Sequence, residues 1–251
     1  MSEDIVQINY SKYGEYSVTE HLELTLPKTT IKIDRIGEHV FSYFRQDSEG
    51  KIIEKMIPAK SNELKIELAP IRPLNHPARR TGYVFLKFDK EIYLSEGDAA
   101  SIFVHCPIEI GIFLINGIHR ESLDWVTCNP LNSRFGLYGS PDTGTLCKYA
   151  EVTLATDLND SIPYIEGVMK ILIENTLNTG QTVSKVIFPI TDNAIYYEGN
   201  KSVVDGIKVT MKKRAVVSIA DVETQPLETD WVSSPTWEAN TSHTSMEMGL
   251  E

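Results

Sequence analysis

The stretch "ELKIEL", residues 63–68, alternates charged and aliphatic side chains with a period of two. Successive side chains of a β-strand point to opposite faces, so the pattern places the aliphatic residues on a buried face and the charges, including Glu67, on a solvent face. The same alternation recurs at residues 22–26 and 207–212. These segments are typical of half-buried antiparallel strands.

Similar strand patterns occupy most of the chain between residues 30 and 190, and turn signals separate them. Asn116-Gly117 is the clearest turn, because this pair favours two-residue hairpins. No segment carries a helical stripe over three turns, and the closest one, residues 119–127, also fits a strand. The sequence therefore predicts an all-β, antiparallel β-sandwich or jelly-roll-like fold, since one long open sheet would leave an apolar face in water.

Loop-forming residues interrupt the strand pattern at 127–133, and we place a boundary between two β units there. The expected organisation is an N-terminal lead at 1–13, a larger β-sandwich unit at 14–128 and a smaller β unit at 129–223. Residues 224–251 are rich in Ser, Thr, Glu and Pro and lack periodicity, which predicts a disordered acidic tail.

Much of the formal charge of −11 lies in this tail and the few residues before it. Seven of the 35 acidic residues and none of the 24 basic residues follow Arg214, so the rest of the chain is near neutrality. Such a body has little long-range attraction for a phosphate backbone, and nucleic acid is not an expected partner. The most apolar run, 108–118, is too short to cross a bilayer, and the acidic N-terminus does not resemble a secretory signal. We expect a cytoplasmic protein without a transmembrane segment.

The three cysteines, Cys106, Cys128 and Cys147, contain no closely spaced pair. This spacing favours buried free thiols in a reducing compartment over a disulfide framework or a zinc site. The sequence predicts no metal centre and no cofactor.

The stretch "LYGSPDTGTLCKY", residues 137–149, contains Gly139 and Gly144 at the spacing of a phosphate-binding loop. Such a loop also requires Lys and then Ser or Thr after the second glycine, where this chain has Thr145 and Leu146. The following residues form a strand pattern, whereas a phosphate loop leads into a helix. The stretch therefore predicts a hairpin loop in which Gly144 tolerates a positive φ.

Charged and aromatic residues surround this predicted hairpin: Arg134, Tyr138, Asp142, Lys148 and Tyr149. Together they form a candidate surface for a partner or a small anion. In the alternative interpretation, Asp142 pairs with Arg134 or Lys148 and only fixes the loop.

A second candidate surface is "PIRPLNHPARRTG", residues 70–82. Its prolines keep the backbone extended, so Arg79 and Arg80 can be presented to a carboxylate or phosphate at little cost in ordering. The alternative is a loop that covers a sheet edge.

Two tryptophans, Trp231 and Trp237, lie in the acidic tail. Large apolar residues in such a segment serve as docking anchors that fold on binding, or else belong to an untethered end.

No catalytic residue is predicted. The chain has neither a G-x-S-x-G nor an H-E-x-x-H motif, and its six histidines are scattered. Glu109 stands out within an apolar strand pattern as a candidate acid. Its simpler interpretation is an outward-facing or edge-blocking charge.

Four stretches resemble an archaeal family of uncharacterised proteins, a domain of unknown function. They are "RFGLYGSPDTGTLCKY" (134–149), "APIRPLNHPARRTGYVFLKFD" (69–89), "VHCPIEIGIFL" (104–114) and "EGVMKILIEN" (166–175). The most specific element is LYG-x-P-x-x-G-x-x-C-x-Y. The resemblance covers roughly residues 14–222, leaves out the tail, and implies no activity.

Two functions are compatible with these observations. The leading hypothesis is a non-enzymatic protein-interaction module that uses the 134–149 hairpin and the 70–82 loop. The alternative is a jelly-roll-like protein that binds a small anion or a carbohydrate between its sheets, with or without hydrolase activity. An enclosed polar pocket favours the alternative.

Overall fold

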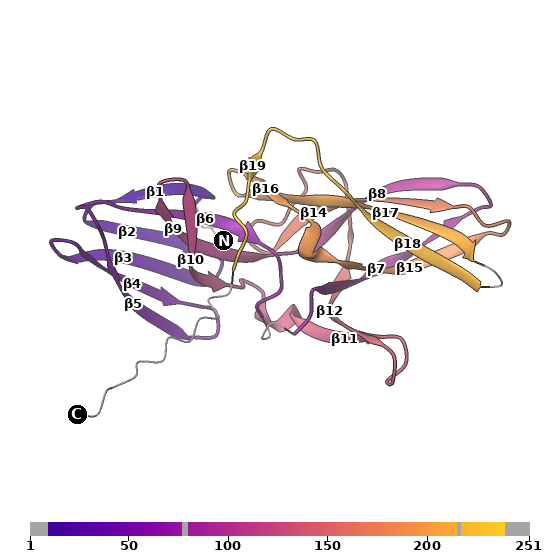
Figure 1. Ribbon diagram of the computed structural model, residues 1–251, viewed down its shortest axis with the longest axis horizontal. Helices are drawn as coiled ribbons and strands as arrows, with labels where there is room; N and C mark the ends of the chain where they lie inside the picture. Colours follow the sequence, from indigo (N-terminus) through magenta and orange to yellow (C-terminus); the bar gives the residue numbers. More distant parts are fainter. Residues whose placement is uncertain (1–9, 77–79, 215–216, 239–251) are drawn as a thin grey trace, which may run out of the picture.

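The computed structural model describes residues 10–76, 80–214 and 217–238. It confirms the predicted all-β fold, and Figure 1 shows two lobes built from strands. Within these residues the only helices are two 3-10 turns, η1 (Pro130–Asn132) and η2 (Ile190–Asp192). In this part of the chain no helix is both long and apolar enough to cross a bilayer.

The first lobe contains two four-stranded sheets with antiparallel neighbours throughout. One sheet has the order β1 (Gly14–Val18), β6 (Leu64–Ile71), β9 (Glu109–Asn116), β10 (His119–Val126). The other has the order β2 (His21–Leu26), β3 (Thr29–Gly37), β4 (Val40–Gln46), β5 (Ile52–Pro58). The predicted Asn116-Gly117 turn joins β9 to β10, and Gly117 has a φ of 64°.

The second lobe contains the remaining strands, also in two sheets. One has the order β11 (Arg134–Tyr138), β12 (Thr145–Val152), β7 (Tyr83–Leu94), β15 (Gln181–Pro189). The other has the order β13 (Leu154–Ala155), β8 (Ala99–Pro107), β14 (Glu166–Asn175), β17 (Lys201–Arg214), β16 (Ile195–Glu198), β19 (Val232–Ser233), and β18 (Val217–Gln225) also pairs with β17. Two pairings, β7 with β12 and β14 with β17, are parallel and depart from the antiparallel pattern.

The sheets are not divided at residues 127–133. Strands β7 and β8 pair with strands that follow this segment, although the chain returns to the first lobe for β9 and β10. Pairing joins strands whose apolar faces share a core, and sequence order does not reveal those partners. The 127–133 segment instead connects the two lobes and contains η1.

Glu67 does not face solvent as its period-two pattern predicted. Its side chain is buried, accepts a 2.9 Å hydrogen bond from the Tyr197 hydroxyl and forms an ion pair with Arg120. Tyr197 belongs to β16 of the second lobe, which covers this face of β6. The alternation correctly predicted that the aliphatic residues of β6 are buried. The face of β6 that carries Glu67 is covered as well, by β16.

The expected disorder of the tail does not hold for residues 224–238. Leu227 donates its backbone N–H to Asp205 at 2.8 Å, and β19 pairs with β16. The Trp237 ring then packs edge-on against Phe113 of the first lobe, with ring centroids 5.7 Å apart. Backbone pairing and aromatic burial offset the cost of ordering this segment. Residues 239–251 lie outside the described residues.

Candidate functional site

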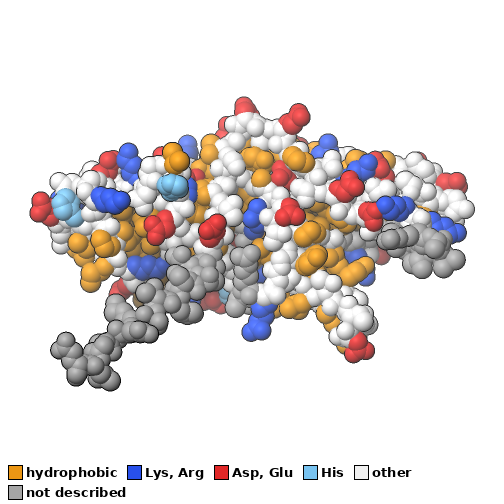
Figure 2. All heavy atoms as spheres, viewed as in Figure 1, with side chains coloured by type: hydrophobic (Ala, Val, Ile, Leu, Met, Phe, Trp, Pro, Cys, Tyr) orange, Lys and Arg blue, Asp and Glu red, His pale blue; other side chains and the backbone are white. Residues whose placement is uncertain are grey.

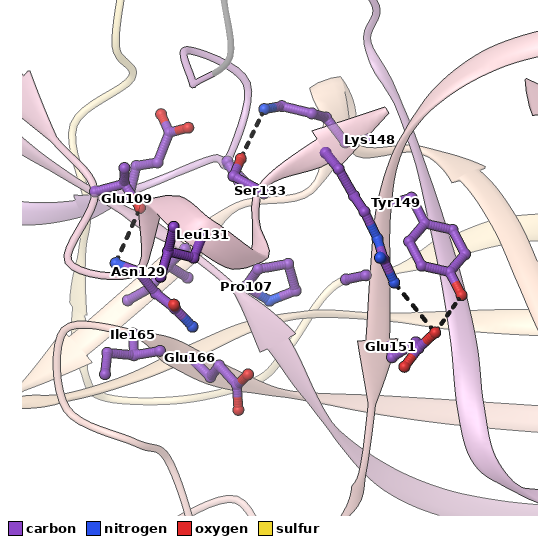
Figure 3. A pocket seen from close by; sticks show the side chains of 15 residues that line it. Pro107, Glu109, Asn129, Leu131, Ser133, Lys148, Tyr149, Glu151, Ile165 and Glu166 are labelled. Carbon is purple, nitrogen blue, oxygen red and sulfur yellow. Dashed lines mark hydrogen bonds and ion pairs between the residues drawn. The ribbon is translucent and has the colours of Figure 1, made fainter. Parts of the chain in front are cut away.

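A polar pocket of about 340 Å³ lies where the 127–133 segment meets strands of both lobes. This volume is in the range of small-molecule sites, roughly 300–1,000 Å³. Figure 3 shows this pocket from close by. The polar side chains of its lining include Glu109, Asn129, Ser133, Arg134, Lys148, Tyr149, Glu151 and Glu166.

Lys148 extends from β12 into this pocket and is buried, with only 4% of its surface exposed. Its Nζ donates a hydrogen bond to Ser133 Oγ at 3.1 Å and lies 5.3 Å from the centre of the Phe135 ring. Burial lowers the pKa of Lys148 to about 8, although the nearby Glu109 opposes this effect. The hairpin rim was expected to present this amine at the surface, but the connecting segment covers it.

Glu109 is also buried, with 2% of its surface exposed, so its expected outward orientation is wrong. Its carboxylate accepts hydrogen bonds from the Asn75 backbone N–H (3.0 and 3.1 Å), the Asn75 side-chain amide (2.8 Å) and the His76 backbone N–H (2.8 Å). The Asn75–His76 loop therefore closes over the face of β9 on which Glu109 lies. Burial raises the pKa of Glu109 to about 7, because it outweighs these donors and the Lys148 charge.

Ser133 links the two stretches that the sequence analysis selected separately. Its hydroxyl donates to the carbonyl oxygen of His76 and accepts from Lys148. The 70–82 loop and the 134–149 hairpin thus meet in one hydrogen-bond network. Sequence reasoning missed Ser133, because it precedes a strand and belongs to no local catalytic motif.

Arg134, Tyr149 and Glu151 form the outer wall of the pocket. The Arg134 guanidinium bonds Glu151 at 3.2 Å and lies 4.6 Å from the centre of the Tyr149 ring. The Tyr149 hydroxyl donates to the same carboxylate at 2.8 Å. The Arg134 charge is therefore paired with an acid on the neighbouring strand, which also lies 3.8 Å from Lys87 Nζ.

The Gly139–Gly144 stretch forms the predicted hairpin turn between β11 and β12. The positive φ, however, belongs to Gly139 (102°) and not to Gly144. At Gly144, a Cβ atom would lie 2.5 Å from the backbone oxygen of Ser140, so this position requires glycine for close packing. Asp142 is exposed and has no ion pair or hydrogen bond with any described residue, so the predicted pairing with Arg134 or Lys148 is wrong.

The other predicted site residues lie outside the pocket. Tyr138 packs against Phe85 on the hairpin surface, and Arg80 is exposed. Trp231 lines a separate cavity beside Glu67, while Trp237 contacts Phe113. Arg79 lies outside the described residues. The pocket therefore brings together Arg134, Lys148 and Tyr149 from the predicted set.

Two further polar groups line the pocket wall. The Asn129 side-chain amide makes no hydrogen bond with the described residues. Glu166, at the start of β14, has its carboxylate 3.7 Å from His105 Nδ1, and burial raises the pKa of this carboxyl. These groups provide a donor and acceptors for a bound molecule.

The fold and the site define a two-lobed, all-β protein with a ligand-sized polar pocket at the junction of its lobes. The chain belongs to the family described as protein of unknown function (DUF432), whose model matches residues 12–247. The match extends beyond the 14–222 range of the sequence resemblance and includes the ordered tail segment. Neither the curated proteins nor the solved structures contain a match to the chain.

Proposed function

We propose that the protein binds a small polyhydroxylated ligand, of the carbohydrate class, in the pocket at the lobe junction. The observation that carries this proposal is a pocket without surplus positive charge, whose lining offers the Asn129 amide and the Glu166 carboxyl to a ligand. Carbohydrate hydroxyls both donate and accept, so they are matched by a mixed set of amide and carboxyl groups.

The charge balance favours a neutral ligand over the small anion that the sequence also suggested. Arg134 is bound to Glu151, and the Lys148 charge faces Glu109. Glu166 adds a further carboxyl with no opposing Lys or Arg in the pocket lining. An anion would therefore enter a site without surplus positive charge, which costs desolvation without a compensating attraction.

We expect that Asn129→Ala and Glu166→Ala each abolish ligand-induced stabilisation, because they remove the amide donor and the carboxyl acceptors from the pocket lining. A panel of mono- and oligosaccharides is tested by thermal unfolding. A ligand at about 100 times its Kd adds about 2.7 kcal/mol of stability. Asn159→Ala, a change at an exposed asparagine of another loop, is the matched control. Stabilisation by phosphate or dicarboxylates, with none by any sugar, would contradict the proposal.

As a second candidate, we propose that the β11–β12 hairpin binds another protein. Figure 2 shows this hairpin projecting from the body with hydrophobic side chains on its visible face. Leu137 and Leu146 are register partners, and with Tyr138 they leave 40–46% of their surfaces exposed. Exposed apolar clusters of this kind favour protein contacts.

Leu137→Ser combined with Leu146→Ser is expected to abolish capture of a specific partner from native extract, with an unchanged melting temperature. The control is Ile118→Ser, because Ile118 is 89% exposed at the tip of a different hairpin. If the double variant captures the partner as well as Ile118→Ser does, the β11–β12 surface is excluded as the binding site. The three buried free thiols support placing either activity in a reducing, cytoplasmic compartment.

A further inference from the structure

Ser133 and Lys148 have the geometry of a nucleophile and its base. Their Oγ and Nζ atoms are 3.1 Å apart, and both residues line the same pocket (Figure 3). A serine hydroxyl becomes a nucleophile when a base lies within about 2.6–3.2 Å of it. We propose that Ser133 attacks, with Lys148 as its general base, a small acyl ester carried on the polyhydroxylated ligand. The choice of substrate class rests on the proposed function, whereas the reactivity of Ser133 does not.

The surroundings of Lys148 favour the neutral amine that this role requires. Its Nζ contacts Ser133 Oγ, and the Phe135 ring lies nearby. The Glu109 oxygens are occupied by the N–H groups of Asn75 and His76. A lysine held directly by a carboxylate stays charged, whereas a buried one without that contact loses its proton more readily, consistent with the lowered pKa of Lys148.

The reaction balances with water as its only co-reactant. Once Lys148 is neutral, the Ser133 hydroxyl turns from the His76 carbonyl towards Nζ. Oγ bonds to the ester carbonyl carbon as Nζ takes its proton, the bond from carbon to the alcohol oxygen breaks, and Nζ returns the proton to that oxygen. Water, activated by the same amine, then releases the carboxylic acid and restores Ser133.

The test is covalent labelling of the full chain with a fluorophosphonate, which traps nucleophilic serines, followed by intact mass and peptide analysis. We expect one adduct, at Ser133, whose rate of formation rises as the pH passes through about 8. Among the charged groups that face Lys148 from neighbouring elements, Glu109 is ionised above pH 7, and burial lowers the pKa of His76. The rise therefore reports Lys148.

Two variants separate catalysis from structure. Ser133→Ala is expected to lose the adduct, and Lys148→Arg to slow labelling about 100-fold, because arginine keeps the charge but cannot accept the proton. Ser140→Ala, at the exposed hairpin tip, is expected to label normally, and thermal unfolding checks that each variant is folded. No adduct in the native chain at pH 9, or a native labelling rate in a folded Lys148→Arg variant, would overturn the inference.

Different results would refute the proposed carbohydrate ligand and the proposed role of Ser133. Sugar-induced stabilisation that persists without labelling would refute only the role of Ser133. Labelling of Ser133 without stabilisation by any sugar would refute only the proposed ligand class.

Discussion

Asp124→Ala is expected to lower the free energy of unfolding by about 3 kcal/mol, because the buried Arg45 guanidinium loses its closest charge partner and retains only the ion pair with Asp47. Arg45 Nε bonds Asp124 Oδ2 at 2.7 Å, and the Tyr43 hydroxyl donates to the same oxygen at 2.8 Å. Arg45 and Asp124 are 4% and 7% exposed. These contacts join β4 of one sheet to β10 of the other, so their loss weakens the packing of the first lobe.

Urea unfolding followed by circular dichroism measures this effect. The matched control is Asp34→Ala, which removes a side-chain contact with His21, and both of these side chains are about half exposed. Exposed pairs contribute about 0–1 kcal/mol, so this variant is expected to stay close to the native stability. A similar loss in both variants would show that burial does not determine the contribution of Asp124.

Glu109→Gln is expected to remove a pH-dependent part of the stability. Burial raises the pKa of Glu109 from its ordinary value of 4.5 to about 7, so the folded chain favours the protonated carboxyl. The stability that this preference provides is complete below pH 4.5 and is lost as the pH rises through 7. The difference in pKa corresponds to about 3 kcal/mol. Glutamine stays neutral and therefore lacks this dependence.

The measurement compares the free energy of unfolding of the native chain and the variant in urea between pH 4.5 and 8.5. The native chain and the variant share every other titrating group. The difference between their free energies of unfolding therefore reports the titration of Glu109. Glu54→Gln, a change at an exposed position of β5, is expected to keep the native pH dependence. If the difference in the free energy of unfolding between the native chain and the Glu109→Gln variant stays constant between pH 4.5 and 8.5, Glu109 does not titrate as described.

The strands and turns were predictable because their signals are local. The alternation in β6, the Asn116-Gly117 turn and the hairpin around Gly139 each depend on residues within a few positions of one another. Turn chemistry and the period of two act at this range. The exclusion of a phosphate loop was equally local, since Thr145 follows Gly144 where such a loop needs lysine.

The candidate site was only partly predictable. Arg134, Lys148 and Tyr149 were selected because they flank one turn, and the structure brings them to one pocket. Asp142 has the same local context but remains at the exposed tip. Ser133 was missed because its significance depends on Lys148, with which it forms no recognisable motif.

By itself, the sequence determined that this chain forms stacked sheets, which residues of an alternating strand such as β6 are aliphatic and buried, and where the chain turns. Only the tertiary structure decided that β7 and β8 join the second lobe, that Glu67 and Glu109 are buried, and that Trp237 packs against Phe113. The physical reason is the separation along the chain over which each effect acts. Periodicity and turn preference act between neighbours, whereas burial and charge pairing depend on strands that lie far apart along the chain and meet only when the sheets assemble.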